Sequence, residues 1–253
     1  MFHCKKLSLC LICLLLLLSY SFAHSQDLKM SETEKGVVQI GVQRDNGSFL
    51  PSAGTGFFLT EDGVIATAYH VYSSLLNALV ESKGARLVAK RVGRNNKMTT
   101  VAPVELISSD EARDVALLKL HPKNDEHWKN VGGIVPLSLH RMKELNAGVP
   151  VTLIGYFGFN VFPVVVRGNL AGTSSFNVSQ GKDVEEFLVS ALMVPGQSGG
   201  PVLLDDGSVI GLINSIIPVM LPPPFNPQQP SHSGLVGVVK CEHIQRLLDM
   251  LKK

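Results

Sequence analysis

The chain has 253 residues, 45% of them hydrophobic and 17% charged, which is enough apolar material for one large domain or two small ones. Its 23 lysines and arginines stand against 21 aspartates and glutamates, so the formal net charge is only +2. A near-neutral chain without basic clusters excludes an electrostatic attraction to nucleic acid or to an anionic membrane surface, and we expect neither as a partner.

The first 25 residues have the pattern of a secretory signal peptide. A positive start at Lys5 and Lys6 precedes an apolar run from Leu7 to Ser19, and small residues follow at Ala23 and Ser25. The apolar run is short for a membrane span, although an uncleaved anchor is the alternative interpretation. We expect cleavage after Ala23 or Ser25, an exported chain that is periplasmic or secreted, and no stable membrane anchor after cleavage.

Export would leave a single cysteine. Cys4, Cys10 and Cys13 lie within the expected signal peptide, and only Cys241 remains in the chain that follows. An intramolecular disulfide is then impossible, so stability must come from the packed core.

Beyond residue 35 the sequence is a series of short β-rich runs separated by turn residues such as Arg44-Asp45-Asn46-Gly47. The expected strands are 37–42, 56–60, 64–68, 86–92, 100–106, 115–120, 150–156, 161–170, 186–194, 201–204, 209–217 and 234–239. Strands at this spacing, with few helical periods, predict an all-β fold of the antiparallel barrel or sandwich class, and the two groups of about six favour two six-stranded antiparallel barrels side by side. We place the N-terminal barrel at about 35–121, a linker at 122–135 and the C-terminal barrel at about 136–240.

The end of the chain predicts one closing helix over 242–252. The apolar residues there recur at helical spacing, namely Ile244, Leu247, Leu248 and Leu251.

The segment from Pro218 to Ser233 contains six prolines and no regular pattern. It predicts an exposed loop, because proline donates no ladder hydrogen bond, and a polyproline ligand for a partner is the alternative.

A glycine-flanked serine is the most informative chemical feature of the chain. Ser198 lies in Pro195-Gly196-Gln197-Ser198-Gly199-Gly200-Pro201, between two β-rich runs. The glycines leave its hydroxyl uncrowded and let backbone N–H groups approach a reacting carbonyl, as a nucleophilic serine requires. The segment also matches the G-x-S-x-G nucleophile elbow. That alternative fails because an elbow needs a helix directly after the serine, whereas Pro201 and a β-rich run follow here.

Upstream partners for this serine are present at His70 and Asp114. His70 follows Thr67-Ala68-Tyr69 at a strand end, and Asp114 opens the strongly apolar run Val115 to Leu120. A histidine at the end of a strand can point into a cleft. An acid at the start of a strongly apolar strand can be buried against that histidine. Each residue taken alone is more often an ordinary histidine or a turn residue.

The order His70, Asp114, Ser198 resembles that of the chymotrypsin-fold serine peptidases, and the local sequences are most similar to the HtrA type. Gly54 to Val71 resembles the Gly-x-Gly-Phe…Thr-x-x-His-Val context of their histidine. Asp114 to Lys119 resembles their Asp-hydrophobic-Ala-hydrophobic-Leu-Lys strand. The serine segment differs from their Pro-Gly-Asn-Ser-Gly-Gly-Pro at one position only, and the resemblance covers about 37–248.

The resemblance implies a His70–Asp114–Ser198 triad in which the histidine moves the serine proton and the aspartate holds the imidazole in the correct tautomer. It also implies an oxyanion hole formed by the backbone N–H groups of Gly196 and Ser198. Gln197 stands where digestive members of the fold have an aspartate that pairs with a newly cut N-terminus. Because glutamine is uncharged, we expect no activation by such a cut.

The resemblance further implies the residues that contact substrate. Leu192 and Met193 lie in the stretch that forms the pocket floor, which predicts a preference for aliphatic side chains, with core packing as the alternative. The strand Asn214-Ser215-Ile216 is expected to pair with extended substrate backbone.

We therefore expect an exported serine endopeptidase acting on protein or peptide substrates. The alternative is a catalytically silent peptidase-fold protein that binds peptides or a protein partner. HtrA-type enzymes usually carry a C-terminal PDZ domain, and the sequence ends directly after the predicted closing helix, so we expect none here. No motif predicts a cofactor or a metal, because the histidines and acids of 121–127 match no usual zinc spacing.

Overall fold

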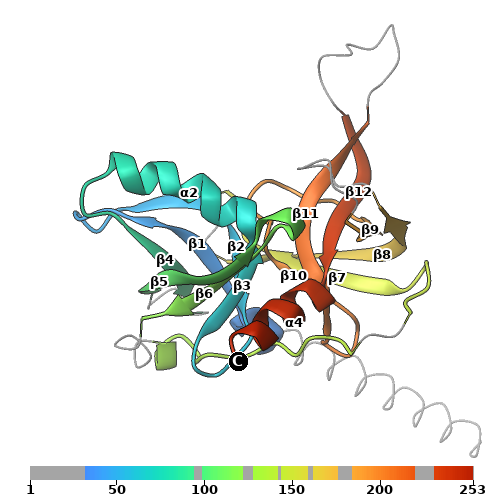
Figure 1. Cartoon of the computed structure of the whole chain (residues 1–253), viewed down its shortest axis with the longest axis horizontal. Coiled ribbons are helices and arrows are strands. Elements are labelled where there is room, and N and C mark those ends of the chain that lie inside the picture. The colour runs from blue at the N-terminus through green and yellow to red at the C-terminus, as the bar shows by residue number, and fades with distance from the viewer. Residues whose placement is uncertain are drawn as a thin grey trace, which may run out of the picture.

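Two β-barrels make up most of the molecule (Figure 1). The computed structural model describes residues 32–93, 99–121, 128–141, 144–158, 162–175, 184–219 and 231–252. The N-terminal barrel contains β1 (Val37–Gln43), β2 (Phe49–Phe58), β3 (Val64–Ala68), β4 (Arg86–Val92), β5 (Thr99–Asp110) and β6 (Val115–Leu120). The C-terminal barrel contains β7 (Pro150–Gly155), β8 (Val164–Ser174), β9 (Glu186–Ser190), β10 (Pro201–Leu203), β11 (Val209–Val219) and β12 (Ser231–Lys240).

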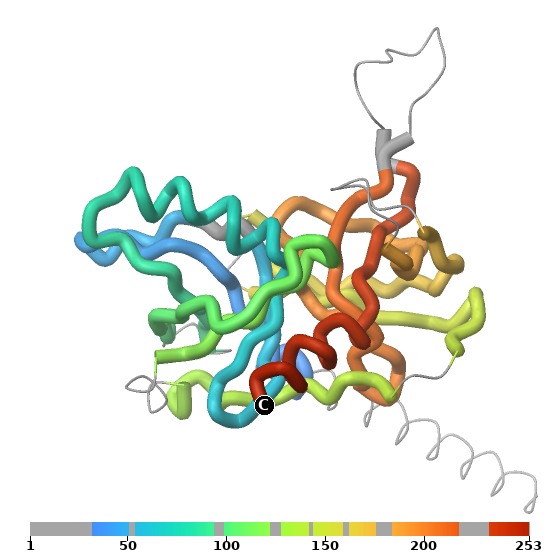
Figure 2. Tube along the Cα trace, viewed as in Figure 1, coloured from blue at the N-terminus to red at the C-terminus, as the bar shows by residue number. Residues whose placement is uncertain are grey.

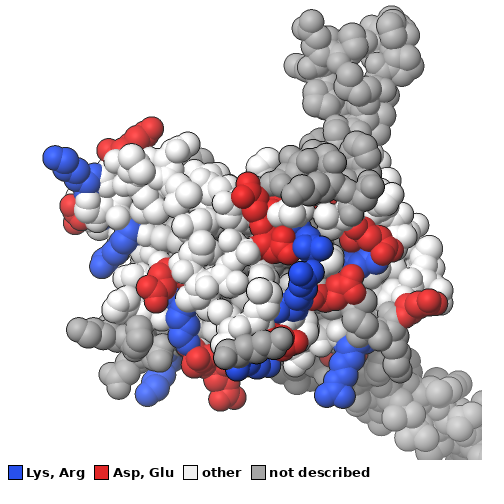
Figure 3. Space-filling model, viewed as in Figure 1, with Lys and Arg blue, Asp and Glu red and all other residues white. Residues whose placement is uncertain are grey.

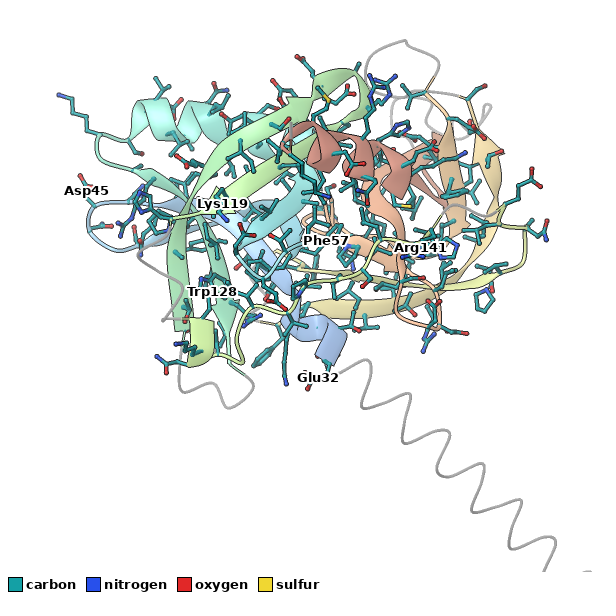
Figure 4. All side chains as sticks on the ribbon, turned by 60° about the horizontal axis from the view of Figure 1, so that its bottom comes forward. Glu32, Asp45, Phe57, Lys119, Trp128 and Arg141 are labelled. Atoms are coloured by element: carbon teal, nitrogen blue, oxygen red, sulfur yellow. The ribbon has the colours of Figure 1, made fainter. Side chains whose placement is uncertain are left out.

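Both barrels are closed and antiparallel. The strand order is β1-β2-β3-β6-β5-β4 in the first barrel and β10-β11-β12-β9-β8-β7 in the second. Every expected strand corresponds to one of these elements, and the prediction of two six-stranded barrels is confirmed. The predicted turn at 44–47 joins β1 to β2, where the Gly47 N–H donates to the Arg44 carbonyl oxygen over 2.9 Å. Asp45 lies at the outer tip of this hairpin (Figure 4).

The core has two parts, one for each barrel. The first fills the N-terminal barrel and continues across the junction through residues such as Tyr156, Leu212 and Ile244. Trp128, in the connection between the barrels, packs its ring edge-to-face on Phe58 with the ring centroids 5.2 Å apart, and Figure 4 shows it beside the N-terminal barrel. The second part fills the C-terminal barrel. Because one core crosses the junction, the two barrels are packed as one body.

The helices α2 (Tyr69–Glu81) and α4 (Cys241–Met250) pack against the barrels. The closing helix is confirmed as α4, which contacts β5 and β6 of one barrel and β11 and β12 of the other. Figure 2 shows it lying across the region where the barrels meet. The helix α2 was not predicted. Its buried Val71 and Leu75 have helical spacing, but Ala68 offers no side-chain cap and β-branched, aromatic and serine residues in the first turns obscure the pattern.

Parts of the chain with a predicted role lie outside the described residues. These parts are the expected signal peptide, 1–25, residues 122–127 of the expected linker, and residues 220–230 of the expected proline-rich loop. The outer residues of the predicted loop belong to strands instead, because β11 extends to Val219 and β12 begins at Ser231. Within the described ranges, no helix combines the length and apolarity needed to cross a membrane. Acidic and basic side chains are interspersed on the face shown in Figure 3, where neither sign forms a continuous patch.

Candidate active site

The three residues predicted to react lie at the ends of elements that meet where the barrels join. His70 is the second residue of α2, Asp114 lies between η1 (Glu111–Arg113) and β6, and Ser198 lies in the loop before β10. The serine loop packs directly on the residues that precede His70. A Cβ atom on Gly199, the next residue after the serine, would lie only 2.9 Å from the backbone nitrogen of Ala68.

Two hydrogen bonds join His70 to Asp114. The His70 backbone N–H donates to Asp114 Oδ1 over 2.7 Å, and His70 Nδ1 lies 2.6 Å from Asp114 Oδ2. Because a carboxylate oxygen accepts, Nδ1 is the nitrogen that carries the proton, and Nε2 keeps its lone pair. Asp114 is only 5% exposed, whereas 44% of the His70 side chain is accessible. The imidazole is therefore held at Nδ1 by a buried acid while much of its side chain stays accessible.

The backbone of Asp114 is left-handed (φ 55°, ψ 43°), which is unique among non-glycine residues of the described part. Asp110 stabilises the preceding turn, because its Oδ1 accepts from the Arg113 N–H over 3.2 Å and its Oδ2 from the guanidinium over 2.8 Å. The Asp114 carbonyl oxygen accepts from the Tyr69 N–H over 3.1 Å. A left-handed residue costs about 1–2 kcal/mol, and aspartate is among the few that tolerate it. These contacts keep the strained residue aimed at the imidazole.

A tight turn from Val194 to Gln197 leads into the serine. The Gln197 N–H donates to the Val194 carbonyl oxygen over 3.3 Å, and Gly196 has φ 101°. With Pro195 at its second position, this is the pattern of a type II turn, which requires a positive φ at the third position and therefore favours glycine. The Gln197 side chain is fully buried, and its Oε1 accepts from the Val194 N–H over 2.9 Å. An uncharged side chain thus closes the turn.

Two backbone N–H groups of this segment are available to an anion. Those of Gly196 and Ser198 have no acceptor in the described part of the chain. By contrast, the Gly199 N–H donates to the Ile213 carbonyl oxygen over 2.7 Å. Most backbone N–H groups in folded proteins are paired, so two unpaired ones in one short loop mark a potential oxyanion site.

Thr55 of β2 ties this turn to the N-terminal barrel. Its fully buried hydroxyl donates to the Gly196 carbonyl oxygen and accepts from the Tyr156 N–H, each over 2.8 Å. Its backbone N–H donates to the Ser198 carbonyl oxygen, also over 2.8 Å. The turn therefore cannot reorient without leaving buried polar groups unpaired. Sequence reasoning gave Thr55 no role, and its only signal was its place between Gly54 and Gly56.

The Ser198 hydroxyl donates to the main-chain carbonyl oxygen of Asn214 over 3.3 Å. This distance is long for a hydroxyl hydrogen bond. Within the described residues, that carbonyl and not the His70 imidazole accepts the hydroxyl proton. Bonds between a nucleophile and its base are often absent or long before substrate binds, so a rotation of the hydroxyl toward Nε2 would complete the arrangement.

The five residues expected to contact substrate lie in different settings. Leu192 is 71% exposed, whereas Met193 is buried in the core of the C-terminal barrel. On β11, Asn214 is buried and Ser215 and Ile216 are half-buried. Leu192 is accessible to a substrate side chain, and for Met193 the structure favours the core-packing alternative.

Glu186, the first residue of β9, is a buried acid that sequence reasoning did not single out. The residue is 2% exposed, and its Oε1 accepts from Asn214 Nδ2 over 2.6 Å. Burial raises the pKa of Glu186, the hydrogen bond from Asn214 opposes this, and the negative charge of Asp114 adds to it. A glutamate that begins a strand is ordinarily exposed, so the sequence held no signal of its burial.

No group of three or more histidine, cysteine, aspartate or glutamate residues in the described ranges could hold a metal ion.

The chain is similar to known peptidases. A family model described as a trypsin-like peptidase domain matches residues 54–212, which is well over half of the chain. Serine protease HTR4 of Rattus norvegicus is 30% identical over 165 residues, covering 64% of this chain and 29% of that protein. A probable periplasmic serine endoprotease of the DegP-like type from Halomonas elongata is 32% identical over 167 residues, covering 65% and 30%. Serine protease HTRA1 of Xenopus laevis is 29% identical over 164 residues, covering 64% and 31%. The chain thus spans less than a third of the length of these relatives.

Proposed function

The chain belongs to the family of trypsin-like peptidases, and we propose that it is a serine endopeptidase that hydrolyses peptide bonds through an acyl-enzyme. The observation that carries this proposal is the His70–Asp114 pair, with its hydrogen bond of 2.6 Å, next to a serine loop that holds two unpaired N–H groups. A base with a fixed tautomer, a serine and two oriented donors are the groups that acyl transfer requires.

In the proposed reaction, Ser198 Oγ bonds to the carbonyl carbon of a peptide while its proton passes to His70 Nε2. The tetrahedral intermediate then expels the amine, which takes that proton and leaves an ester on the serine. Water attacks the ester with the same assistance, releases the carboxylic acid and restores the hydroxyl. Asp114 keeps its hydrogen bond to Nδ1 and stabilises the imidazolium that forms in each half of the cycle.

The N–H groups of Gly196 and Ser198 are proposed to receive the negative oxygen of the intermediate. The loss of one such donor typically costs about 3 kcal/mol of transition-state stabilisation. The hydrogen bonds of Thr55 and Gln197 to the turn support a hole that is ordered without any charged partner. Activation by cleavage of a precursor is therefore not required in this proposal.

We further propose that an extended peptide pairs with β11 at Asn214-Ser215-Ile216. Main-chain pairing of this kind accepts many sequences, and specificity then comes from side-chain contacts. Leu192, which is apolar and 71% exposed, supports a preference for aliphatic residues. Protein or peptide substrates follow from this mode of binding.

Export is part of the same proposal. The signal-peptide pattern over residues 1–25, which lies outside the described residues, supports it. So does the similarity to a protein of Halomonas elongata that is named a probable periplasmic serine endoprotease. We propose a periplasmic or secreted chain with no membrane anchor after cleavage.

One observation favours a second candidate function, a catalytically silent peptidase-fold protein that binds peptides. The Ser198 hydroxyl donates to the Asn214 carbonyl oxygen and not to His70. A serine that kept this bond when substrate arrived could not transfer its proton to the imidazole, although β11 could still pair with a peptide.

Labelling with a fluorophosphonate separates the two candidates, because the reagent bonds only to an activated serine. The peptidase proposal predicts labelling of the wild type and none of Ser198→Ala. A wild type that binds peptides but gives no Ser198-dependent labelling would support the silent alternative and exclude the enzyme. Matched thermal unfolding curves for the two proteins ensure that the comparison concerns chemistry and not folding.

A further inference from the structure

Glu186 has a defined place beside the site and no part in the proposed reaction. In the barrel it stands opposite Ser174 of β8 and Val239 of β12. Its Oε1 accepts from Asn214 Nδ2 over 2.6 Å, and both residues are buried. Burying an acid is costly unless it is hydrogen-bonded, and the bond from Asn214 offsets part of that cost.

The second oxygen of the same carboxyl group is packed against β12. A Cβ atom on Gly237 would lie 2.9 Å from Glu186 Oε2 and 2.9 Å from Ser215 Oγ. Only a glycine leaves room for the carboxyl group at this position. The carboxyl group of Glu186 is therefore confined between Asn214 on one side and the bare backbone of Gly237 on the other.

Asn214 lacks the cross-strand partner in β12 that the residues on either side of it have. In the register of β11 and β12, Ile213 stands opposite Val238 and Ser215 opposite Gly237, with an irregularity between them. Asn214 is the extra residue of this bulge and has no opposite partner in β12. A bulge re-aims its backbone, and its extra residue needs another anchor. The hydrogen bond to Glu186 supplies that anchor.

The carbonyl group of this bulge residue is the one that accepts the Ser198 hydroxyl over 3.3 Å. We propose that Glu186 is a positioning residue for the nucleophile: by holding the Asn214 side chain, it fixes the bulge whose carbonyl oxygen keeps the Ser198 side chain in the place from which its hydroxyl rotates toward His70 Nε2 when substrate binds. This inference rests on the proposed peptidase function and adds a residue to it. Asn214 also begins the segment proposed to pair with substrate. The hydrogen bond from Glu186 would therefore position both the nucleophile and the substrate-binding strand.

The proposed role depends on an acceptor oxygen at this position and not on the negative charge of the carboxyl group. Since burial raises the pKa of Glu186, the folded protein already resists the charged form. A glutamine keeps an acceptor oxygen for Asn214 Nδ2 at nearly the same volume, whereas a leucine fills the space without any acceptor. Glu186→Gln should therefore preserve the site, and Glu186→Leu should release the bulge.

The test compares these two variants by the second-order rate of fluorophosphonate labelling, calculated per active site from burst titration. We expect Glu186→Gln within about threefold of the wild type and Glu186→Leu slower by about 10- to 100-fold, the range for a displaced reacting group. Glu185→Gln is the matched control, because Glu185 is adjacent but exposed and pairs with Lys240 over 2.8 Å. It should label at the wild-type rate. A merely structural role would lower the unfolding temperature or the active fraction and leave the rate per site unchanged.

Asn214→Ala completes a double-mutant cycle and keeps the test decisive if Glu186→Leu does not fold. Because Glu186 acts through Asn214, Asn214→Ala should slow labelling as much as Glu186→Leu, and the double variant should be no slower than either. The inference is overturned if folded Glu186→Leu or Asn214→Ala labels at the wild-type rate, if Glu186→Gln is as slow as Glu186→Leu, or if the two effects multiply. A wild type that does not label at all overturns the peptidase proposal itself, so the two failures are distinguishable.

Discussion

The hydroxyl of Thr55 donates a 2.8 Å hydrogen bond to the carbonyl oxygen of Gly196, 141 residues further along the chain. The bond crosses from the N-terminal barrel to the turn that precedes the serine, and the same hydroxyl accepts from the Tyr156 N–H. The shape of the proposed oxyanion hole therefore depends on how the two barrels are docked. Removing the hydroxyl should disturb the turn without touching the three residues proposed to react.

Thr55→Val is the sharpest test of this dependence, because valine has the shape of threonine and lacks its hydroxyl. It leaves two buried polar groups unpaired, each at a penalty of about 1–3 kcal/mol, and kcat should fall by about 10- to 100-fold. Thr55→Ser, which keeps the hydroxyl, should remain within a few-fold of the wild type. Steady-state kinetics with a peptide substrate provides the measurement.

Thr152→Val is the control for this series. The Thr152 hydroxyl is also buried but has no hydrogen-bond partner in the described part of the chain, so its removal should affect neither the turn nor the rate. Equal losses of kcat in the Thr55→Val and Thr152→Val variants would show that the Thr55 hydroxyl has no special relation to the turn.

Asp114→Asn should reduce kcat by about 10⁴-fold while the protein remains folded. Asparagine tolerates the left-handed backbone at this position, but it replaces one acceptor oxygen with a donor. It can therefore no longer accept from both the His70 N–H and Nδ1, and the imidazole is driven to the wrong tautomer. Kinetics alongside circular dichroism checks the expectation. Activity within tenfold of the wild type would mean that Asp114 does not orient the base.

The free energy of unfolding should show the raised pKa of Glu186 as a dependence on pH. The folded protein holds the proton more tightly than the unfolded chain, so this group stabilises the fold most at low pH. That contribution is lost as the pH rises from the ordinary carboxyl value of 4.5 through the raised value. The loss is about 1.4 kcal/mol for each unit by which the pKa is raised.

Urea unfolding of Ser198→Ala with and without Glu186→Gln, at a series of pH values, isolates this term and avoids self-digestion. The charged neighbours stay the same in both proteins, namely Asp114, which acts on Glu186, and the Lys240–Glu185 pair beside it. The glutamine variant should gain stability relative to its parent as the pH rises. A constant difference, or the opposite slope, would contradict a raised pKa.

Leu192 should influence which side chains are accepted at the scissile bond. The wild type should favour aliphatic residues in a peptide library, and Leu192→Asp should shift the preference toward arginine by about tenfold in kcat/KM. Val80→Asp, on α2, places the same charge at another exposed apolar residue and should change nothing. An arginine preference in the wild type would contradict the proposed apolar contact.

The sequence alone predicted the barrels well because each strand has a local signal. Alternating apolar runs and turn residues such as Asn46-Gly47 depend only on near neighbours. The helix α2 was missed because its first turn begins at Tyr69 and His70, with a strand directly before it and no capping side chain. In this place the packing of Val71 and Leu75 on the barrel outweighs the weak local preference for a helix.

The candidate site also contains residues that the sequence alone can indicate and residues that it cannot. His70, Asp114 and Ser198 lie in recognisable motifs, so a sequence can name them. Thr55 and Glu186 are joined to the site by hydrogen bonds to residues far along the chain, and no local sequence pattern predicts such bonds. Burial was also invisible, since Leu192 and Met193 are neighbours in sequence but one is exposed and the other lies in the core.

Digestion of an unfolded protein such as reduced casein tests the central claim most directly. The account predicts that the wild type cuts casein into peptides whose new carboxyl termini incorporate oxygen from solvent water. Ser198→Ala should leave casein intact while showing the same thermal unfolding. Casein that stays intact with the folded wild type, or that is cut equally by both proteins, would contradict it.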